Sequence, residues 1–234
     1  MSTQFILSLL VTLSIVAVVS GYNATASVDK NAKGSDFMYL LAYSWTPGFC
    51  NTQSNDPGCS APQDYWKNHF TLHGLWPQYY DTGYPSFCTD VDFDAKYPEA
   101  VGMDTMTKYW PNVQAKEGTS SYDDFWEHEW TKHGTCSTLD EQTYFQTAID
   151  TIEKYGTPSI VTENVGGTLS ADDIRNAFGG KQRVALKCSN NKYLVGAYSC
   201  WSQKNGIPQA QVDCNNEVVS EDTCHADDIE IQAL

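Results

Sequence analysis

Four of the five histidines lie in two short segments, residues 69–77 and 125–136, together with other groups that can move protons or carry charge. On a helix with about 100° of rotation per residue, the second segment places its functional groups within an arc of about 140°. A helix face with two imidazoles, an ammonium group, a carboxylate and an aromatic ring is a poor core surface and a suitable anion site. These groups are Phe125, His128, Glu129, Lys132 and His133.

Histidine side chains titrate near neutral pH, so one imidazole can act as a base while another acts as an acid. A lysine supplies positive charge where negative charge develops in a transition state. This set of groups suits phosphoryl transfer to an internal hydroxyl, as in the cleavage of RNA through the ribose 2′-hydroxyl, and that reaction needs no metal. Other acid–base reactions, and an ordinary solvated helix face, stay open at this point.

A zinc site is the main chemical alternative for the second segment. His128-Glu129 begins like the H-E-x-x-H pattern of zinc enzymes, but position 132 is Lys and His133 comes one residue too late. A cation inserted among the candidate ligands argues against a bound metal. We therefore expect no metal and no cofactor, and chelator sensitivity would reveal a metal-dependent hydrolase instead.

The elements that must position these groups mix strands and helices without βαβ regularity. Aromatic and branched residues predict strands over 36–45 and 70–76, the second of them ended by Pro77. The expected class is α+β, a single domain with a central antiparallel sheet, flanking helices and disulfides. The other expected elements are helices over 98–110, 122–133 (with Ser121 as N-cap), 140–155 and 170–178, a hairpin over 183–188 and 193–201, and a strand over 209–214.

Composition excludes several classes of protein. The chain has 234 residues, 41% of them hydrophobic, with 7 Trp, 14 Tyr and 9 Phe, so it can build a sizeable core and is not disordered over most of its length. Charged residues make up only 18%, which argues against a coiled coil. A formal charge of −15 argues against a broad basic face for nucleic acid, although it allows a small local cationic site.

The N-terminus has the pattern of a secretory signal peptide. An apolar run over residues 5–19 precedes Ser20 and Gly21, and it is shorter than the roughly 20 residues that span a bilayer. We expect a signal peptide over 1–20, an N-terminal segment over 21–35 and the folded domain over 36–234. Because no Lys or Arg precedes Lys30, an uncleaved anchor is the alternative. Asn23 lies in the only N-x-[ST] sequon and is the expected glycosylation site.

Two motifs make the sequence recognisable. Phe70-Thr71-Leu72-His73-Gly74-Leu75-Trp76-Pro77 and His128-Glu129-Trp130-Thr131-Lys132-His133-Gly134-Thr135-Cys136 resemble the two active-site segments of the ribonuclease T2 family, in the same order and separation. The resemblance extends from about Asp36 to Cys224. It implies an α+β fold with a central antiparallel sheet and an endoribonuclease that is secreted, vacuolar or lysosomal.

The resemblance also implies a role for each catalytic residue. His133 and His73 would be the acid–base pair, with His133 expected on the 2′-hydroxyl and His73 on the 5′-oxygen. Glu129 and Lys132 would stabilise the pentacoordinate phosphorane, and His128 would bind the phosphate. The expected product is a 2′,3′-cyclic phosphate that is slowly hydrolysed to a 3′-phosphate, and DNA should not react because it lacks the 2′-hydroxyl.

Base recognition is expected to rest on aromatic rings, since single-stranded bases stack on them. Trp76 and Phe125 match ring positions of relatives, Tyr84 is a further candidate, and Trp126 and Trp130 turn away toward the core. Two departures from the family pattern leave base preference open. Relatives often carry Q-x-W where Tyr43-Ser44-Trp45 stands here, and some carry Asp where Gln78 stands.

Eight cysteines in an exported chain predict four disulfides. The resemblance implies the pairs Cys50–Cys59, Cys88–Cys136, Cys188–Cys224 and Cys200–Cys214. The expected protein is a monomeric ribonuclease of low base specificity that acts on single-stranded RNA, has no membrane contact after signal cleavage, and works extracellularly or in a lysosome or vacuole. Its acidity predicts an optimum at roughly pH 4.5 to 6.5. An inactive ribonuclease-fold protein that serves as a store, toxin-like binder or ligand is the competing hypothesis.

Overall fold

The computed structural model describes residues 36–53 and 55–234. The predicted signal peptide, the segment over 21–35 and the sequon at Asn23 lie outside the described residues. Within the described part of the chain, no helix is long and apolar enough to cross a membrane.

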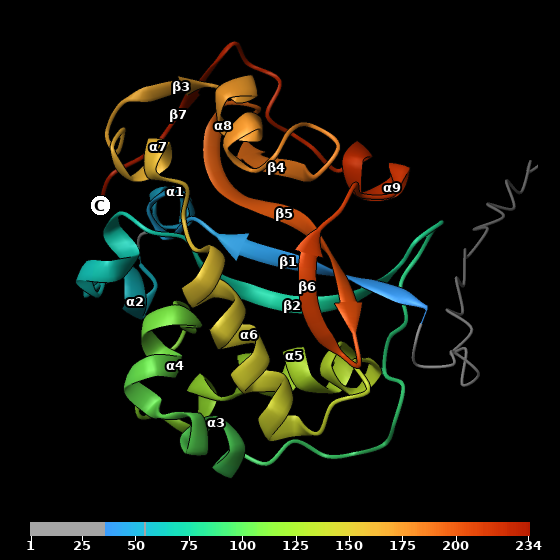
Figure 1. The fold of residues 1–234 in the computed structure, drawn as a ribbon. Coiled ribbons are helices and arrows are strands. Elements are labelled where there is room, and N and C mark those ends of the chain that lie inside the picture. Colours follow the sequence, from blue (N-terminus) through green and yellow to red (C-terminus); the bar gives the residue numbers. More distant parts are fainter. Residues whose placement is uncertain (1–35, 54) are drawn as a thin grey trace, which may run out of the picture.

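A mixed sheet forms the centre of the fold (Figure 1). Its strand order is β2-β1-β5-β7-β3, and β4 and β6 also pair with β5. The pairings are antiparallel apart from a single parallel bridge between Tyr193 of β5 and Glu230 of β7. The strands are β1 (Phe37–Ser44), β2 (Thr71–Tyr79), β3 (Thr168–Ser170), β4 (Val184–Ser189), β5 (Tyr193–Lys204), β6 (Ile207–Gln211) and β7 (Asp228–Glu230).

β2 carries the first motif, and it is longer than the sequence predicts. The prediction that Pro77 ends this strand is wrong, because the strand continues to Tyr79 with Pro77 opposite Tyr39 of β1. β2 is the outer strand next to β1 in the sheet order. An edge strand tolerates a proline because the missing N–H can face away from the neighbouring strand.

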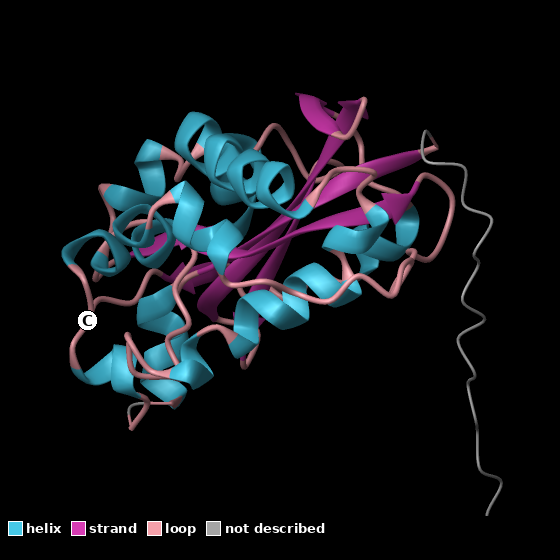
Figure 2. Cartoon of the chain, turned by 90° about the horizontal axis from the view of Figure 1, so that it is seen from below, coloured by secondary structure: helices cyan, strands magenta, loops and turns pink. Residues whose placement is uncertain are grey.

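Helices pack around this sheet (Figure 2), and α3, α4, α5 and α6 gather on one side of β1 and β2 (Figure 1). The described α-helices are α1 (Thr46–Thr52), α2 (Pro57–Ser60), α3 (Lys96–Val101), α4 (Met103–Tyr109), α5 (Asp124–Lys132), α6 (Glu141–Tyr155), α7 (Ser159–Thr162), α8 (Ala171–Ala177) and α9 (Asn216–Ser220). Three 3₁₀ turns, η1 (Asp64–Lys67), η2 (Ser120–Tyr122) and η3 (Gly134–Cys136), complete the helical elements of that part of the chain.

Two predicted helices differ from the observed ones. The single helix expected over 98–110 is divided into α3 and α4 by Gly102, whose φ of +112° does not fit a helix. The helix expected over 122–133 begins later, because Ser121 lies inside η2 and Asp123 occupies the N-cap position of α5. The expected starts of α6 and α8 are confirmed, with Asp140 and Ser170 accepting hydrogen bonds from backbone N–H groups.

The larger of the two core clusters among the described residues includes side chains of β1, β2, α5 and α6. Trp126 and Trp130 are buried in it, as expected, with 0% and 3% of their surface exposed. The cysteines pair as Cys50–Cys59, Cys88–Cys136, Cys188–Cys224 and Cys200–Cys214, which are the four pairs implied by the resemblance. The bond between Cys88 and Cys136 joins the loop after β2 to η3, directly after α5.

Candidate active site

β2 and α5 approach each other closely at Gly74, and this contact brings the two motifs together. A Cβ atom on Gly74 would lie 2.0 Å from Oε2 of Glu129 and 2.2 Å from Nε1 of Trp76. Both distances are far below van der Waals contact, so any larger residue would push the carboxyl and the indole apart. Glycine is therefore required here by close approach.

The backbone of β2 on both sides of Gly74 is held by side chains from the helical layer. The indole N–H of Trp110 donates a hydrogen bond of 2.9 Å to the carbonyl of His73. The hydroxyl of Tyr144 donates one of 3.0 Å to the carbonyl of Leu75. These bonds fix the strand that presents His73 to the site.

Glu129 is fully buried and forms one hydrogen bond with the first motif. The indole N–H of Trp76 donates to Oε2 of Glu129 at 2.6 Å. The other oxygen, Oε1, has no hydrogen-bond partner among the described residues and lies 3.8 Å from Nε2 of His73. Burial raises the pKa of Glu129 to about 8, although the Trp76 bond and the charge of Lys132 act in the opposite direction. This carboxyl therefore keeps its proton at acidic and neutral pH.

The two expected catalytic imidazoles flank the same indole ring. Trp76 stacks on His133, with ring centroids 4.9 Å apart and 19° between the planes, and meets His73 edge-on at 5.1 Å. Loss of hydration inside the protein lowers the pKa of His133 to about 3, and the charge of Lys132 lowers it further. The pKa of His73, whose side chain is partly exposed, is lowered as well, and desolvation is the main cause. Both rings are thus neutral at pH 7 when no anion is bound.

The remaining predicted site residues surround this pair. His128 is exposed, and its ring lies 6.4 Å from that of His133. The ammonium group of Lys132 lies 6.0 Å from the centre of the Tyr84 ring, which is itself 6.2 Å from His133. Phe125 contacts His73 edge-on at 5.4 Å. The structure therefore brings all eight expected catalytic and base-binding residues into one region.

Three of these residues could also offer ligands to a metal ion. The ligand atoms of His128, Glu129 and His133 lie within 4.8 Å of one another. Glu129 would first have to lose the proton that burial retains, and the positive charge of Lys132 acts on all three groups. The charges of the site thus favour an anion over a cation.

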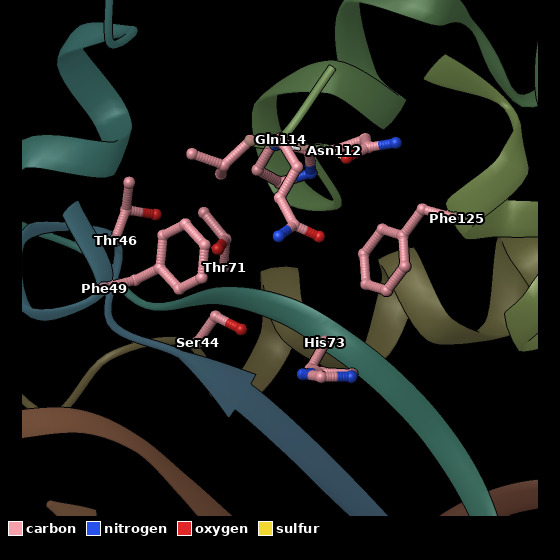
Figure 3. A pocket seen from close by; sticks show the side chains of 10 residues that line it. Ser44, Thr46, Phe49, Thr71, His73, Asn112, Gln114 and Phe125 are labelled. Atoms are coloured by element: carbon pink, nitrogen blue, oxygen red, sulfur yellow. Dashed lines mark hydrogen bonds between the residues drawn. The ribbon is translucent and has the colours of Figure 1, made fainter. Parts of the chain in front are cut away.

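Next to His73 lies a cavity of about 140 Å³ that the sequence analysis missed (Figure 3). Phe49 and Phe125 stand at opposite sides of it, and the amide of Gln114 points between them (Figure 3). The hydroxyls of Thr46 and Thr71 are buried and have no hydrogen-bond partner within the described part of the chain. The polar group that points into the space between the two rings is the Gln114 amide, which can both donate and accept a hydrogen bond.

Sequence spacing could not reveal this cavity, because its walls come from distant segments. Thr71 lies in the first motif, whereas Thr46 and Phe49 follow β1 and Gln114 follows α4. Tyr43, which stands where relatives of the family often carry Gln, is buried against Phe70 and Phe178. Its neighbour Ser44 lines the cavity instead, and Gln78 is also buried.

Known proteins show the same pattern of sequence and fold. Residues 35–214 match the model of the Ribonuclease T2 family. The chain is 31% identical over 194 residues to Ribonuclease DdI of Dictyostelium discoideum, covering 77% of this chain and 81% of that protein. It is 30% identical over 209 residues to Ribonuclease 1 of Arabidopsis thaliana, covering 82% and 86%. Among solved structures it resembles ribonuclease MC1 from the seeds of bitter gourd, with a TM-score of 0.64, 27% identity and coverage of 83% and 99%.

Proposed function

The chain belongs to the ribonuclease T2 family and is an endoribonuclease, and from that premise we propose that it cleaves single-stranded RNA by metal-free transfer of the phosphoryl group to the 2′-hydroxyl. One observation carries this proposal. His73 and His133 both contact the ring of Trp76, next to a buried, protonated Glu129 and the cation of Lys132. This is an acid–base pair beside a place for one phosphate.

In the first step, His133 accepts the proton of the 2′-hydroxyl while the 2′-oxygen attacks phosphorus. The bond between phosphorus and the 5′-oxygen breaks, and His73 donates a proton to that oxygen. The products are a 2′,3′-cyclic phosphate and a free 5′-hydroxyl. The reaction needs one neutral and one protonated imidazole, which a pair of histidines can supply without a metal.

Charge stabilisation comes from three other groups. Lys132 offers an ammonium group to the equatorial oxygens of the phosphorane, and exposed His128 offers an imidazole at the phosphate. Because Glu129 keeps its proton, this buried carboxyl adds no negative charge beside the phosphate. Oε1 of Glu129 lies 3.8 Å from Nε2 of His73, which supports a role for this buried carboxyl directly behind the imidazole that faces the phosphate.

In the second step, water opens the cyclic phosphate with the two histidines in exchanged roles. His73 accepts a proton from water, the bond from phosphorus to the 2′-oxygen breaks, and His133 returns a proton to that oxygen. A 3′-phosphate results. DNA does not enter this sequence because it has no 2′-hydroxyl.

Bases on the two sides of the scissile phosphate have different surroundings. On the His133 side, the half-exposed ring of Tyr84 can stack on a base, while Trp76 borders the same space. On the His73 side, the cavity between Phe49 and Phe125 takes the next base. The Gln114 amide offers both a donor and an acceptor there, so it can bond to different base edges, which supports low base specificity.

The proposal includes export. A signal peptide over 1–20 would deliver the domain over 36–234 to the extracellular space or to a lysosome or vacuole, as a monomer and with Asn23 glycosylated if the chain is cut before it. Four disulfides support an oxidising destination. N-terminal sequencing and mass measurement of the secreted protein test the cleavage site and the sugar together.

The test of the reaction uses oligonucleotides that contain a single ribonucleotide in a DNA chain. We expect cleavage on the 3′ side of that ribonucleotide, in excess EDTA, and no cleavage of a matched all-deoxy chain. Cleavage of both chains would contradict attack by the 2′-hydroxyl. Activity that returned only with added metal would favour a metal-dependent hydrolase, and an inert, folded protein would favour the storage or binding hypothesis.

A further inference from the structure

In the loop after β2, Phe87 exposes its aromatic ring to solvent and has an unfavourable backbone conformation. Phe87 is 52% exposed and has a φ of +50°. The left-handed region is unfavourable for a bulky side chain, and three of the other four described non-glycine residues with positive φ are asparagines, which tolerate it. Backbone strain of this kind persists only where the surroundings impose it, and it is concentrated at functional sites.

The backbone of Phe87 and Cys88 is bonded to the C-terminal end of α5 and to η3. The N–H of Phe87 donates a hydrogen bond of 3.0 Å to the carbonyl of Lys132. The next residue, Cys88, donates from its N–H to Oγ1 of Thr135 at 3.1 Å and forms the disulfide with Cys136. The backbone is therefore fixed against the end of α5, while the ring is left accessible.

Phe87 continues a row of exposed rings that begins in the active site. Tyr84, which borders His133 and Lys132, is 49% exposed and lies only three residues earlier. Three residues span at most about 11 Å, so the two rings are within reach of neighbouring nucleotides. Resting on the proposed function, we propose that Phe87 is an additional subsite that stacks on a base of the RNA strand lying 5′ to the nucleotide held at Tyr84.

The chemistry of the loop favours bases over phosphates as its partners. Asp81, Asp90 and Asp92 flank the two rings along the sequence and would repel a phosphate backbone. Stacking on an aromatic ring does not depend on that charge and accepts any base, since every base has a π-face. The subsite should thus improve the binding of longer strands without selecting a sequence.

The experiment compares a cleavable dinucleotide with two tetranucleotides, one extended by two nucleotides on its 5′ side and one on its 3′ side. For wild type, the 5′ extension should raise kcat/KM above the value for the dinucleotide. In Phe87→Asn this gain, the ratio of the two kcat/KM values, should be smaller by roughly five-fold or more, because stacking on one ring is lost. The corresponding ratio for the 3′-extended substrate should stay at its wild-type value. Phe87→Tyr should preserve both ratios, and Val91→Ala, which changes another exposed apolar residue of the same loop, serves as the matched control.

The thermal stability of the same variant is a second measurement, and it should change in the opposite direction to the activity. Since asparagine tolerates positive φ, Phe87→Asn should raise Tm while it weakens cleavage of the 5′-extended strand. An unchanged 5′ ratio, or an equal loss for both extensions, would overturn the subsite. Failure of wild-type protein to cleave the dinucleotide at all would instead overturn the proposed function.

Discussion

Trp76 has a part in the site that goes beyond the base stacking expected from its sequence position. Its indole N–H holds Glu129 at 2.6 Å, and its face stacks on His133. One residue of the first motif thus orients two residues of the second. The contacts make Trp76 a positioning residue, whereas its contact with a base remains a prediction.

Trp76→Phe separates these two roles, because phenylalanine can still stack but cannot donate a hydrogen bond. We expect kcat to fall roughly ten-fold or more, since Glu129 is left with no partner for either oxygen, and KM to change little. The control is Trp66→Phe, which also removes indole hydrogen bonds, but to the backbone carbonyls of Thr107 and Lys108 instead of to Glu129. A rise in KM with unchanged kcat would show that base stacking is the main role of Trp76.

The burial of Glu129 also predicts how stability depends on pH. Its folded-state pKa of about 8 lies above the ordinary value of 4.5, so between these two values the folded state holds a proton that the unfolded state has released. Its contribution to the free energy of unfolding is therefore complete below pH 4.5 and is lost as pH rises toward 8.

Glu129→Gln imitates the protonated carboxyl and removes this loss. We expect the variant to unfold at a higher denaturant concentration than wild type at pH 8, and to differ less from it at pH 5. Urea unfolding at the two pH values measures the effect, with Glu127→Gln on the exposed side of α5 as control. An equal difference at both values would contradict a buried, protonated Glu129.

Among the elements, the turn after β2 depends on a helix near the C-terminus. Oε2 of Glu217 in α9 accepts hydrogen bonds from the N–H of Gly83 at 2.6 Å and from the hydroxyl of Thr82 at 2.9 Å. The side chain of Asn215 donates to the carbonyl of Tyr79 at 2.8 Å. α9 thereby fixes the turn that leads to Tyr84.

Loosening this turn should weaken substrate binding more than catalysis. We expect Glu217→Ala to raise KM roughly two- to ten-fold with little change in kcat, because two hydrogen bonds to the turn are lost. Glu217→Gln keeps an acceptor oxygen and should restore most of the wild-type KM. If both substitutions raise KM equally, the hydrogen bonds to the turn are not the cause; if neither does, the turn does not need α9.

Local sequence patterns predicted the elements that hold the motifs, but not the contacts between them. β1 could be predicted because its residues are aromatic and apolar, and α6 because its apolar residues follow a helical period that Gly156 and Pro158 end. The prediction that β2 ends at Pro77 was wrong because a strand can include a proline when it lies at the edge of the sheet. The position of β2 at the edge is a property of the tertiary structure. The cavity beside His73 was unpredictable for the same reason, since Thr46 and Gln114 meet only in the folded chain.

At the scale of the whole molecule, an acidic protein must bind a polyanion. The formal charge of −15 repels RNA at neutral pH, while the site itself offers Lys132 and two imidazoles whose pKa values are low in the free enzyme. Lowering the pH acts on both, because it neutralises surface carboxylates and protonates one histidine.

Activity should therefore have an acidic optimum, at roughly pH 4.5 to 6.5. Desolvation lowers the pKa of His73 in the free enzyme, whereas a bound phosphate favours its protonated form; kcat should therefore decline toward neutral pH as the substrate complex loses that proton. Added salt at pH 7 should recover only the part that arises from long-range repulsion, since screening acts between exposed charges. Profiles at two ionic strengths separate the two causes, and an optimum above pH 8 would contradict both.

The central claim is that His73 and His133 together transfer a phosphoryl group to the 2′-oxygen without a metal. Phosphorus NMR of a short RNA digested at pH 5 in excess EDTA tests this most directly, with wild type beside His73→Ala and His133→Ala. We predict a 2′,3′-cyclic phosphate signal that appears first and later converts to a 3′-phosphate, and almost no product from either variant. A 5′-phosphate end, or full activity in either variant, would contradict the mechanism.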